Sequence, residues 1–261
     1  MSSNRTTASG LGSNRMLLFR RMELKYLIDR TTRTALTRDL RAFMQPDKHT
    51  EQDGSYIVRS LYFDTQAYKA YHEKMSGAAI RHKLRVRAYG ADPSQAEFVR
   101  LEVKSRYVSF IYKITVDVPI WRYGEIEPAL LGYELPPEWI LNDTNVSKEF
   151  FRLQRQLNMQ PMILVQYRRE AYERRELNRV RVNFDDQLMA TRHLDLLGPL
   201  VGARPLLRHG NCIFEIKVDG AMPFWLHMLI GKYNLQNEAI SKFCHAIRSQ
   251  ARFSMLSRPE D

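Results

Sequence analysis

The chain has 261 residues, a formal net charge of +11 and 44% hydrophobic residues, which fits a globular protein of one large or two small domains. The basic balance favours anionic partners, such as nucleic acid, a phospholipid surface or phosphorylated small molecules, without choosing among them. No apolar run approaches the roughly 18–20 residues that span a bilayer, so we expect no transmembrane helix.

The ends of the chain differ from its middle. Residues 1–15 are rich in Ser, Thr, Gly and Asn and lack the apolar stretch of a signal peptide, which predicts a disordered tail. We expect one domain over residues 16–253 and a short tail at 254–261.

Cys212 and Cys244 lie among apolar neighbours without the spacing of metal ligands. They indicate reduced, buried thiols and therefore a cytoplasmic protein.

Alternation of charged and apolar residues predicts strands along most of the chain. The first covers residues 18–28, with Arg21, Glu23 and Lys25 on one face, and an amphipathic helix follows at 29–44. A strand at 56–63 and a short helix at 66–74 come next.

The strand at 79–89 carries the clearest pattern. Its cations stand at every second position, and side chains of a strand alternate between its faces, so four cations share one face: Arg81, Lys83, Arg85 and Arg87. The strands at 98–104 and 110–118 continue the pattern with carboxylates among the cations. The residues that share a face there are Arg100, Glu102 and Lys104, then Lys113, Thr115 and Asp117.

The prolines and short helical patterns of residues 119–160 indicate a helical insertion. Strands resume at 162–171, 179–185 and 212–218, and helices at 223–233 and 238–253 end the pattern. Helices inserted singly among many strands favour an α+β fold, an antiparallel barrel with added helices, over a doubly wound parallel sheet. The charged faces of these strands then either line the interior of the barrel or form the solvent-exposed side of a sheet.

Seven short strings occur in the order known from one protein family. They are RMELKYLI from residue 21, SLYFDT from 60, KLRVRAYG from 83, LEVK from 101, YRREAY from 167, FEIK from 214 and SKF from 241. Together they resemble the VTC (vacuolar transporter chaperone) catalytic domain, a branch of the CYTH-like triphosphate tunnel metalloenzyme superfamily. The resemblance extends over about residues 19–248.

The resemblance implies an antiparallel eight-stranded tunnel that makes polyphosphate from ATP with Mn²⁺ or Mg²⁺. It implies that Glu215 holds the metal, that Arg85, Arg87, Lys217 and Glu215 are catalytic, and that Tyr62 binds phosphate through its hydroxyl. The phosphate-binding cations that it implies are Lys25, Arg85, Arg87, Lys104, Arg169, Lys217 and Lys242, and strand phase adds Lys113 and Arg181.

The first motif departs from the wider superfamily, which opens with Glu-x-Glu-x-Lys. Here Arg21 stands in place of the first carboxylate, ahead of Glu23 and Lys25. This exchange favours phosphate binding over a second metal, and it favours the VTC branch over hydrolases and cyclases.

Several alternatives stay open at this stage. A tunnel phosphohydrolase acting on tripolyphosphate or a nucleoside triphosphate would need nearly the same interior, and a polyphosphate- or inositol-phosphate-binding module would need no catalysis. Nucleic acid is not expected, because carboxylates interrupt the basic faces. Strand phase does not decide whether Arg168 or Arg169 faces the interior, and Lys242 on a helix is by default a surface lysine. A membrane partner is compatible with the resemblance, and the oligomeric state is open.

Overall fold

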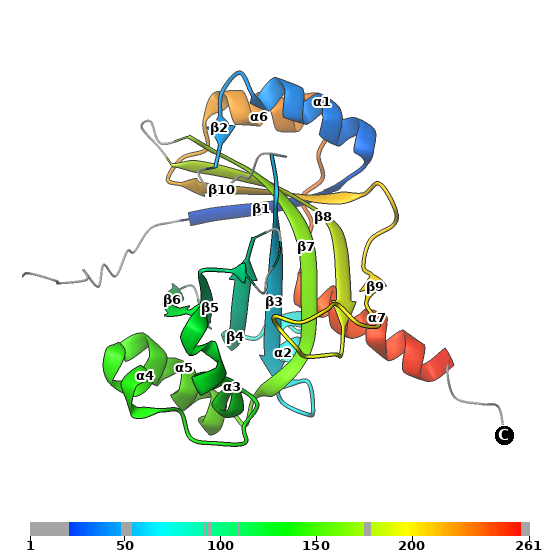
Figure 1. The fold of residues 1–261 in the computed structure, drawn as a ribbon. Helices are drawn as coiled ribbons and strands as arrows, with labels where there is room; N and C mark the ends of the chain where they lie inside the picture. The colour runs from blue at the N-terminus through cyan, green and yellow to red at the C-terminus, as the bar shows by residue number, and fades with distance from the viewer. Residues whose placement is uncertain are drawn as a thin grey trace, which may run out of the picture.

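The protein is built around one strongly curled antiparallel sheet (Figure 1). This computed structural model describes residues 21–47, 54–90, 92, 95–108, 110–174 and 179–256, so the predicted tail at residues 1–15 lies outside the described residues. Eight strands follow one another across the sheet in the order β1 (Arg21–Ile28), β10 (Cys212–Asp219), β8 (Val180–Thr191), β7 (Gln160–Arg174), β3 (Tyr56–Asp64), β4 (Ile80–Tyr89), β5 (Phe98–Tyr107) and β6 (Phe110–Pro119).

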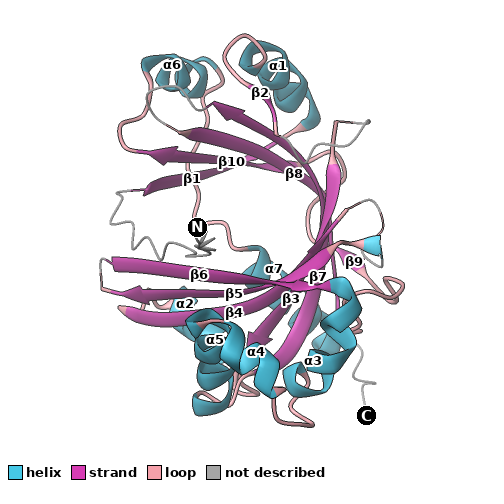
Figure 2. Ribbon diagram, turned by 60° about the vertical axis from the view of Figure 1, so that its left-hand side comes forward, coloured by secondary structure: helices cyan, strands magenta, loops and turns pink. Residues whose placement is uncertain are grey.

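The predicted α+β fold with eight antiparallel strands is confirmed. The sheet is a half-barrel, with β1 and β6 as its two end strands and an open side between them (Figure 2). Two further strands contain two residues each: β2 (Gln45–Pro46) pairs with β7, and β9 (Arg204–Pro205) pairs with β8. Strands this short carry no alternation, so the sequence pattern does not predict them.

Helices cover the convex side of the sheet in two groups (Figures 1 and 2). The helices α1 (Arg30–Leu40) and α6 (Phe224–Lys232) pack on β10 and β8, where Leu36, Leu226 and Phe214 share one apolar core. The helices α3 (Tyr123–Leu130), α4 (Glu138–Asp143) and α5 (Asn145–Gln156), with a 3₁₀ turn at Ile120–Arg122, form a second core with β4, β5 and β6.

The last helix, α7 (Lys242–Leu256), packs on the other side of the sheet. Phe243, Cys244 and Ile247 share a core with Tyr62 of β3 and Val165 of β7. The short helix α2 (Lys69–Met75) lies between β3 and β4 in the chain and contacts α7. Because α7 begins against the inner side of the sheet, its first residues lie beside the inward-facing charges.

None of the helices formed by the described residues is long and apolar enough to cross a membrane.

Candidate active site

The concave face of the sheet collects the charged side chains that strand phase puts together. In the β-ladder, Lys25 is opposite Glu215 and Glu215 is opposite Asn183. On the other half of the sheet, Arg85 is opposite Tyr62 and also opposite Glu102. Residues opposite each other in a ladder point to the same face, so the alternation seen in the sequence becomes one continuous ionic surface.

Glu215 is the centre of a first group of cations, which we call the Glu215 cluster. Its carboxylate lies 2.8 Å from Lys217 Nζ, 3.5 Å from Lys25 Nζ and 3.7 Å from the Arg169 guanidinium. Asn183 donates a further hydrogen bond to it at 3.1 Å. The implied assignment of Glu215, Lys217, Lys25 and Arg169 to one site therefore matches their positions.

Lys242 joins this cluster from α7. Its Nζ is 2.6 Å from Asp185, which also accepts a hydrogen bond from Arg169 Nε at 2.6 Å. Both cations lie over the ring of Tyr167, with Lys242 Nζ 4.8 Å from the ring centroid. Lys242 is therefore not a surface lysine, because the packing of Phe243 turns the start of α7 towards the sheet.

Glu102 is the centre of a second group, the Glu102 cluster. Its carboxylate accepts a hydrogen bond from Arg85 and lies 3.5 Å from Arg87 and 3.6 Å from Lys113. The ring of Tyr62 lies under the Arg85 guanidinium, 6.0 Å from ring centroid to carbon. Glu102 is only 2% exposed, so three cations compensate one buried negative charge and leave the cluster positive.

Glu23 and Lys104 connect the two clusters across the open side of the half-barrel. Glu23 on β1 is 2.8 Å from Lys25, and its other oxygen accepts from Lys104 on β5 at 3.4 Å. These residues are 81 positions apart in the sequence.

Two further ion pairs lie on the same face. Arg181 donates to Asp47 and, at 3.2 Å, to the Tyr56 hydroxyl. Arg100 donates to Asp117 from two of its guanidinium nitrogens, Nε and Nη2. Arg181 thus lies on the predicted face, but Asp47 already neutralises its charge.

The carboxylates of the two clusters stay ionised. Burial raises the pKa of Glu215, but Lys217, Lys25, Lys242 and Arg169 together hold it well below its ordinary value. Burial likewise opposes the ionisation of Glu102, yet its cations lower its pKa strongly. The balance of burial against Arg169 and Lys242 leaves the pKa of Asp185 at about 2. Such carboxylates are weak bases near neutral pH.

Two lysines of the concave face, Lys217 and Lys83, have lowered pKa values. Burial, with Arg169 adding repulsion, lowers the pKa of Lys217 to about 8 despite its contact with Glu215. Burial also lowers the pKa of Lys83 to about 8, and Lys104 opposite it adds repulsion. Among the described residues, Lys83 has no ion-pair partner. A partly buried lysine without a carboxylate is stabilised when an anion binds beside it.

The structure shows which of the two neighbouring arginines on β7, Arg168 or Arg169, faces the concave side of the sheet. Arg169 belongs to the Glu215 cluster, whereas Arg168 donates twice to Asp186 and lines a cavity on the convex side of the sheet. β7 keeps its alternation here, since Val165, Tyr167 and Ala171 share the inner core with α7 and Arg169 is in phase with them, and the register shift between Gln166 and Arg168 adds its extra residue on β8. Counting by twos puts Arg168 and Arg169 on opposite faces of β7, but it does not say which face turns inwards.

Sequence reasoning assigned no site role to three residues that lie on the concave face. They are Lys83, Asn183 and Asp185. Their strand phase was visible in the sequence, and Lys83 shares the face of Arg85 and Arg87. The partners of Asp185 lie on β7 and α7, which no local pattern connects.

The carboxylates of the concave face determine how a divalent metal ion could bind. The described residues contain no group of three or more His, Cys, Asp or Glu side chains that could hold an ion alone. Glu23 and Glu215, however, both approach Lys25 Nζ, at 2.8 and 3.5 Å. Mg²⁺ is commonly bound by one or two carboxylates together with substrate phosphates. The donor set therefore fits an ion that arrives with phosphate oxygens.

The concave face carries an excess of positive charge that water can reach. The side chains of Lys104 and Lys113 are 42% and 46% exposed, and those of Lys25 and Lys217 about half as much. Cations outnumber carboxylates on this face. The cations are Lys25, Arg81, Lys83, Arg85, Arg87, Arg100, Lys104, Arg106, Lys113, Arg169, Arg181, Lys217 and Lys242, against Glu23, Asp47, Glu102, Asp117, Glu173, Asp185, Glu215 and Asp219. Such a surface suits an extended, multiply charged anion.

Comparison with known proteins identifies a family. The family model of the VTC domain matches residues 20–251, nearly the whole chain, which confirms the resemblance found in the sequence. No curated protein matches the sequence.

Solved structures share the fold at low identity. An adenylyl cyclase candidate from Hippeastrum, in which triphosphatase activity is dominant, is 14% identical, with 87% of this chain and 95% of that chain covered and a TM-score of 0.50. A candidate adenylate cyclase from Bacillus halodurans is 13% identical over 84% of this chain and 92% of that chain, with a TM-score of 0.47. At these identities the likeness concerns the fold alone.

Proposed function

The chain belongs to the VTC domain family, and we propose that it is a polyphosphate polymerase. In this reaction the γ-phosphoryl group of ATP is transferred to the terminal oxygen of a polyphosphate chain on the concave face. The bond from the γ-phosphorus to the bridging oxygen breaks, a bond to the chain oxygen forms, and ADP leaves. No proton is consumed or released, because the accepting oxygen is already ionised.

The observation that carries the proposal is the state of the carboxylates. Glu102, Asp185 and Glu215 are each surrounded by cations and have lowered pKa values. A hydrolase needs a group that orients or deprotonates water, whereas transfer to an ionised phosphate needs positioning and neutralised charge. The ionised carboxylates hold the cations in position, and with their lowered pKa values they do not themselves supply the base that a hydrolase needs.

The two clusters divide the binding between them. Arg85 and Arg87 present planar guanidinium groups, which pair with two phosphate oxygens at once. Lys25, Lys217 and Lys242 present compact charges from the other half of the face. At an effective dielectric near 20, each close charge contact is worth roughly 4 kcal/mol before desolvation. Donors fixed in place before the reaction stabilise the charge that develops on the transferred group.

A divalent ion, Mn²⁺ or Mg²⁺, would be held by Glu215 and Glu23 together with phosphate oxygens, where it neutralises charge on the phosphates.

The second candidate is hydrolysis of tripolyphosphate or a nucleoside triphosphate. The triphosphatase activity of the Hippeastrum protein, which shares the fold, favours it. Both reactions would use the same concave face, so the products must decide between them.

The test is to incubate the purified full chain with ATP and Mn²⁺ or Mg²⁺, with a chelator as control. Products are separated on a polyacrylamide gel stained for polyphosphate, while ADP and free phosphate are assayed in parallel. We expect a metal-dependent ladder, with ADP formed and little free phosphate. Free phosphate equal to ADP and no ladder would reject the polymerase in favour of the hydrolase.

A further inference from the structure

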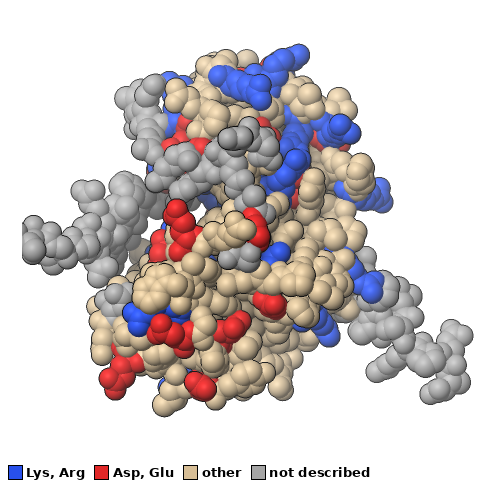
Figure 3. Space-filling view, in the orientation of Figure 1, with Lys and Arg blue, Asp and Glu red and all other residues tan. Residues whose placement is uncertain are grey.

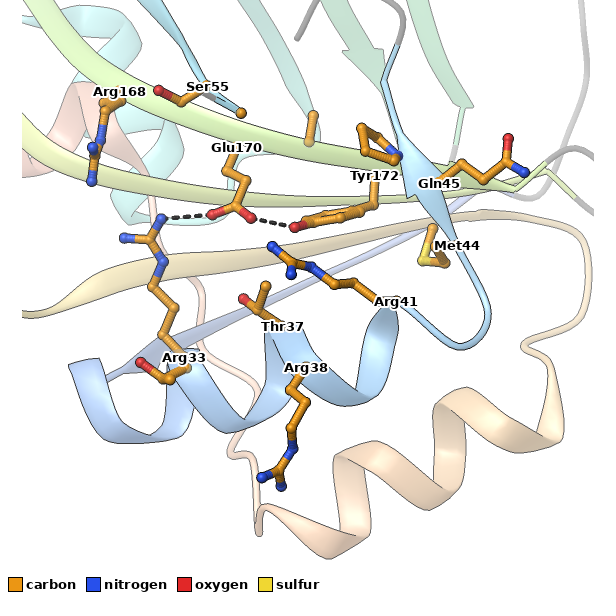
Figure 4. Close-up of a pocket in the computed structure, with 14 residues that line it drawn as sticks. Arg33, Thr37, Arg38, Arg41, Met44, Gln45, Ser55, Arg168, Glu170 and Tyr172 are labelled. Atoms are coloured by element: carbon orange, nitrogen blue, oxygen red, sulfur yellow. Dashed lines mark hydrogen bonds and ion pairs between the residues drawn. The ribbon is translucent and has the colours of Figure 1, made fainter. Parts of the chain in front are cut away.

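A cavity lies on the convex side of the sheet, between α1 and β7 (Figure 4). Its volume of about 830 Å³ is within the range of small-molecule sites, about 300–1,000 Å³. Arg33, Thr37 and Arg41 reach it from α1 and its end, and Glu170 and Tyr172 reach it from β7. Glu170 and Tyr172 leave β7 on the side opposite to the Glu215 cluster, so this cavity is separate from the concave face.

The lining of the cavity is basic. Among the described residues of the lining, the carboxylate of Glu170 stands against four arginines: Arg33, Arg38, Arg41 and Arg168. In the space-filling view, Lys and Arg side chains gather around the α1 end of the molecule (Figure 3). The cavity is therefore a place where the excess charge of the chain is concentrated on the outer surface.

Two of these arginines are held by carboxylates. Arg33 donates to Glu170 at 2.8 Å and also pairs with Asp186, which accepts from Arg168 as well. Glu170 in turn accepts a hydrogen bond from the Tyr172 hydroxyl. The negative charge of Glu170 is thus compensated before any ligand arrives, and the network fixes the wall of the cavity on the β7 side.

Arg41 and Thr37 are the groups left for a ligand. Among the described residues, Arg41 has no carboxylate partner, and it extends towards the Tyr172 hydroxyl (Figure 4). Thr37 stands between Arg33 and Arg41, and its Oγ1 is buried without a hydrogen-bond partner. A buried hydroxyl without a partner is rare. An oxygen of a bound anion would satisfy it once the Arg41 side chain, one turn further along, turns towards the anion and uncovers it.

We propose that this cavity is a second phosphate-binding site, which takes a small phosphorylated anion through the Arg41 guanidinium and the Thr37 hydroxyl. A guanidinium with free nitrogens pairs with two phosphate oxygens, and the hydroxyl donates to a third. The phosphate groups come from a free phosphate chain or from a phosphorylated organic molecule. A carboxylate in the wall of the cavity would repel the continuous anionic backbone of nucleic acid. The site does not depend on the polymerase reaction.

The test is a calorimetric titration of the full chain with tripolyphosphate and, separately, with glucose 6-phosphate. Arg41→Ala and Thr37→Val remove the two ligand groups, and Lys217→Met weakens the concave face. Arg152→Ala is the matched control, because Arg152 is an exposed arginine on α5 that pairs with Glu149 at 2.7 Å. Thermal unfolding of each variant checks that the fold is kept.

We expect tripolyphosphate to bind wild type in two classes, of which Lys217→Met weakens one. Arg41→Ala should weaken the other class about tenfold and Thr37→Val about fivefold, whereas Arg152→Ala should change neither. Glucose 6-phosphate binding that requires Arg41 would identify an organic phosphate as the source, and binding of tripolyphosphate alone would identify a phosphate chain. The proposal is overturned if Arg41→Ala and Thr37→Val leave every class unchanged. A protein that makes no polyphosphate can still show binding that depends on Arg41, so the two proposals fail separately.

Discussion

At the scale of a single residue, the charge of Lys83 has opposite effects on the stability of the free protein and on the binding of an anion. It is a partly buried cation without a carboxylate partner among the described residues, so its charge costs stability in the free protein. Residues that destabilise the free protein in this way are typical of binding sites.

We therefore expect Lys83→Met to weaken tripolyphosphate binding about tenfold while the midpoint of thermal unfolding stays the same or rises. Lys69→Met is the matched control, because Lys69 on α2 is exposed and pairs with Glu73. Calorimetry and a thermal melt measure the two effects. A variant that loses stability and keeps its affinity would make Lys83 a structural residue.

Lys217 predicts a pH dependence. Its pKa of about 8 lies below the ordinary lysine value of 10.5 because burial disfavours the charged form. Lys217 is charged below pH 8 and loses its proton as the pH rises through this value, so phosphate affinity should fall above about pH 8. Bound phosphate favours the charged form and moves the fall to higher pH.

The measurement is the dissociation constant of tripolyphosphate between pH 7 and 10, for wild type and for Lys217→Arg. Arginine remains charged over this range, so the variant should lose less affinity than wild type. The same ligand is used for both proteins, and its own titration cancels in the comparison. Equal pH profiles would exclude Lys217 as the titrating group.

At the scale of an element, α7 brings a cation to the sheet by packing. Phe243 lies 5.4 Å from the ring of Tyr62, centroid to centroid, and Lys242 precedes it in the chain. We expect Phe243→Ala to lower the free energy of unfolding by about 3–5 kcal/mol and to weaken phosphate binding, because Lys242 loses its position. Phe151→Ala on α5 is the control, since Phe151 is equally buried, at 3% exposure, in the convex core.

Both variants should be destabilised by similar amounts, measured by urea unfolding, and only Phe243→Ala should lose affinity per folded molecule. Equal affinity in the two variants would mean that the position of α7 does not matter for the site.

Strands were easier to predict than the contacts between them. Period two placed Lys25, Arg85, Arg87 and Lys217 on one face, because the phase of a strand is a local property. It could not choose Arg169 over Arg168, because phase does not show which face of β7 turns inwards, nor could it place Lys242, which depends on how a helix packs. Resemblance to a family supplied those two assignments.

At the scale of the whole molecule, the curl of the sheet brings distant charges together. Glu23 and Lys104 meet across the open side of the half-barrel although 81 positions separate them. Local alternation predicts that both face inwards, but the distance between them depends on the curvature of the whole sheet, which no single segment specifies.

The most direct test of phosphate binding on the concave face is a crystal structure of the full chain with tripolyphosphate. We expect the phosphate chain between the Glu102 and Glu215 clusters, within hydrogen-bond distance of Arg87 and Lys217. Tripolyphosphate bound only outside the concave face, with Arg87 and Lys217 still paired to Glu102 and Glu215 alone, would contradict the proposed site.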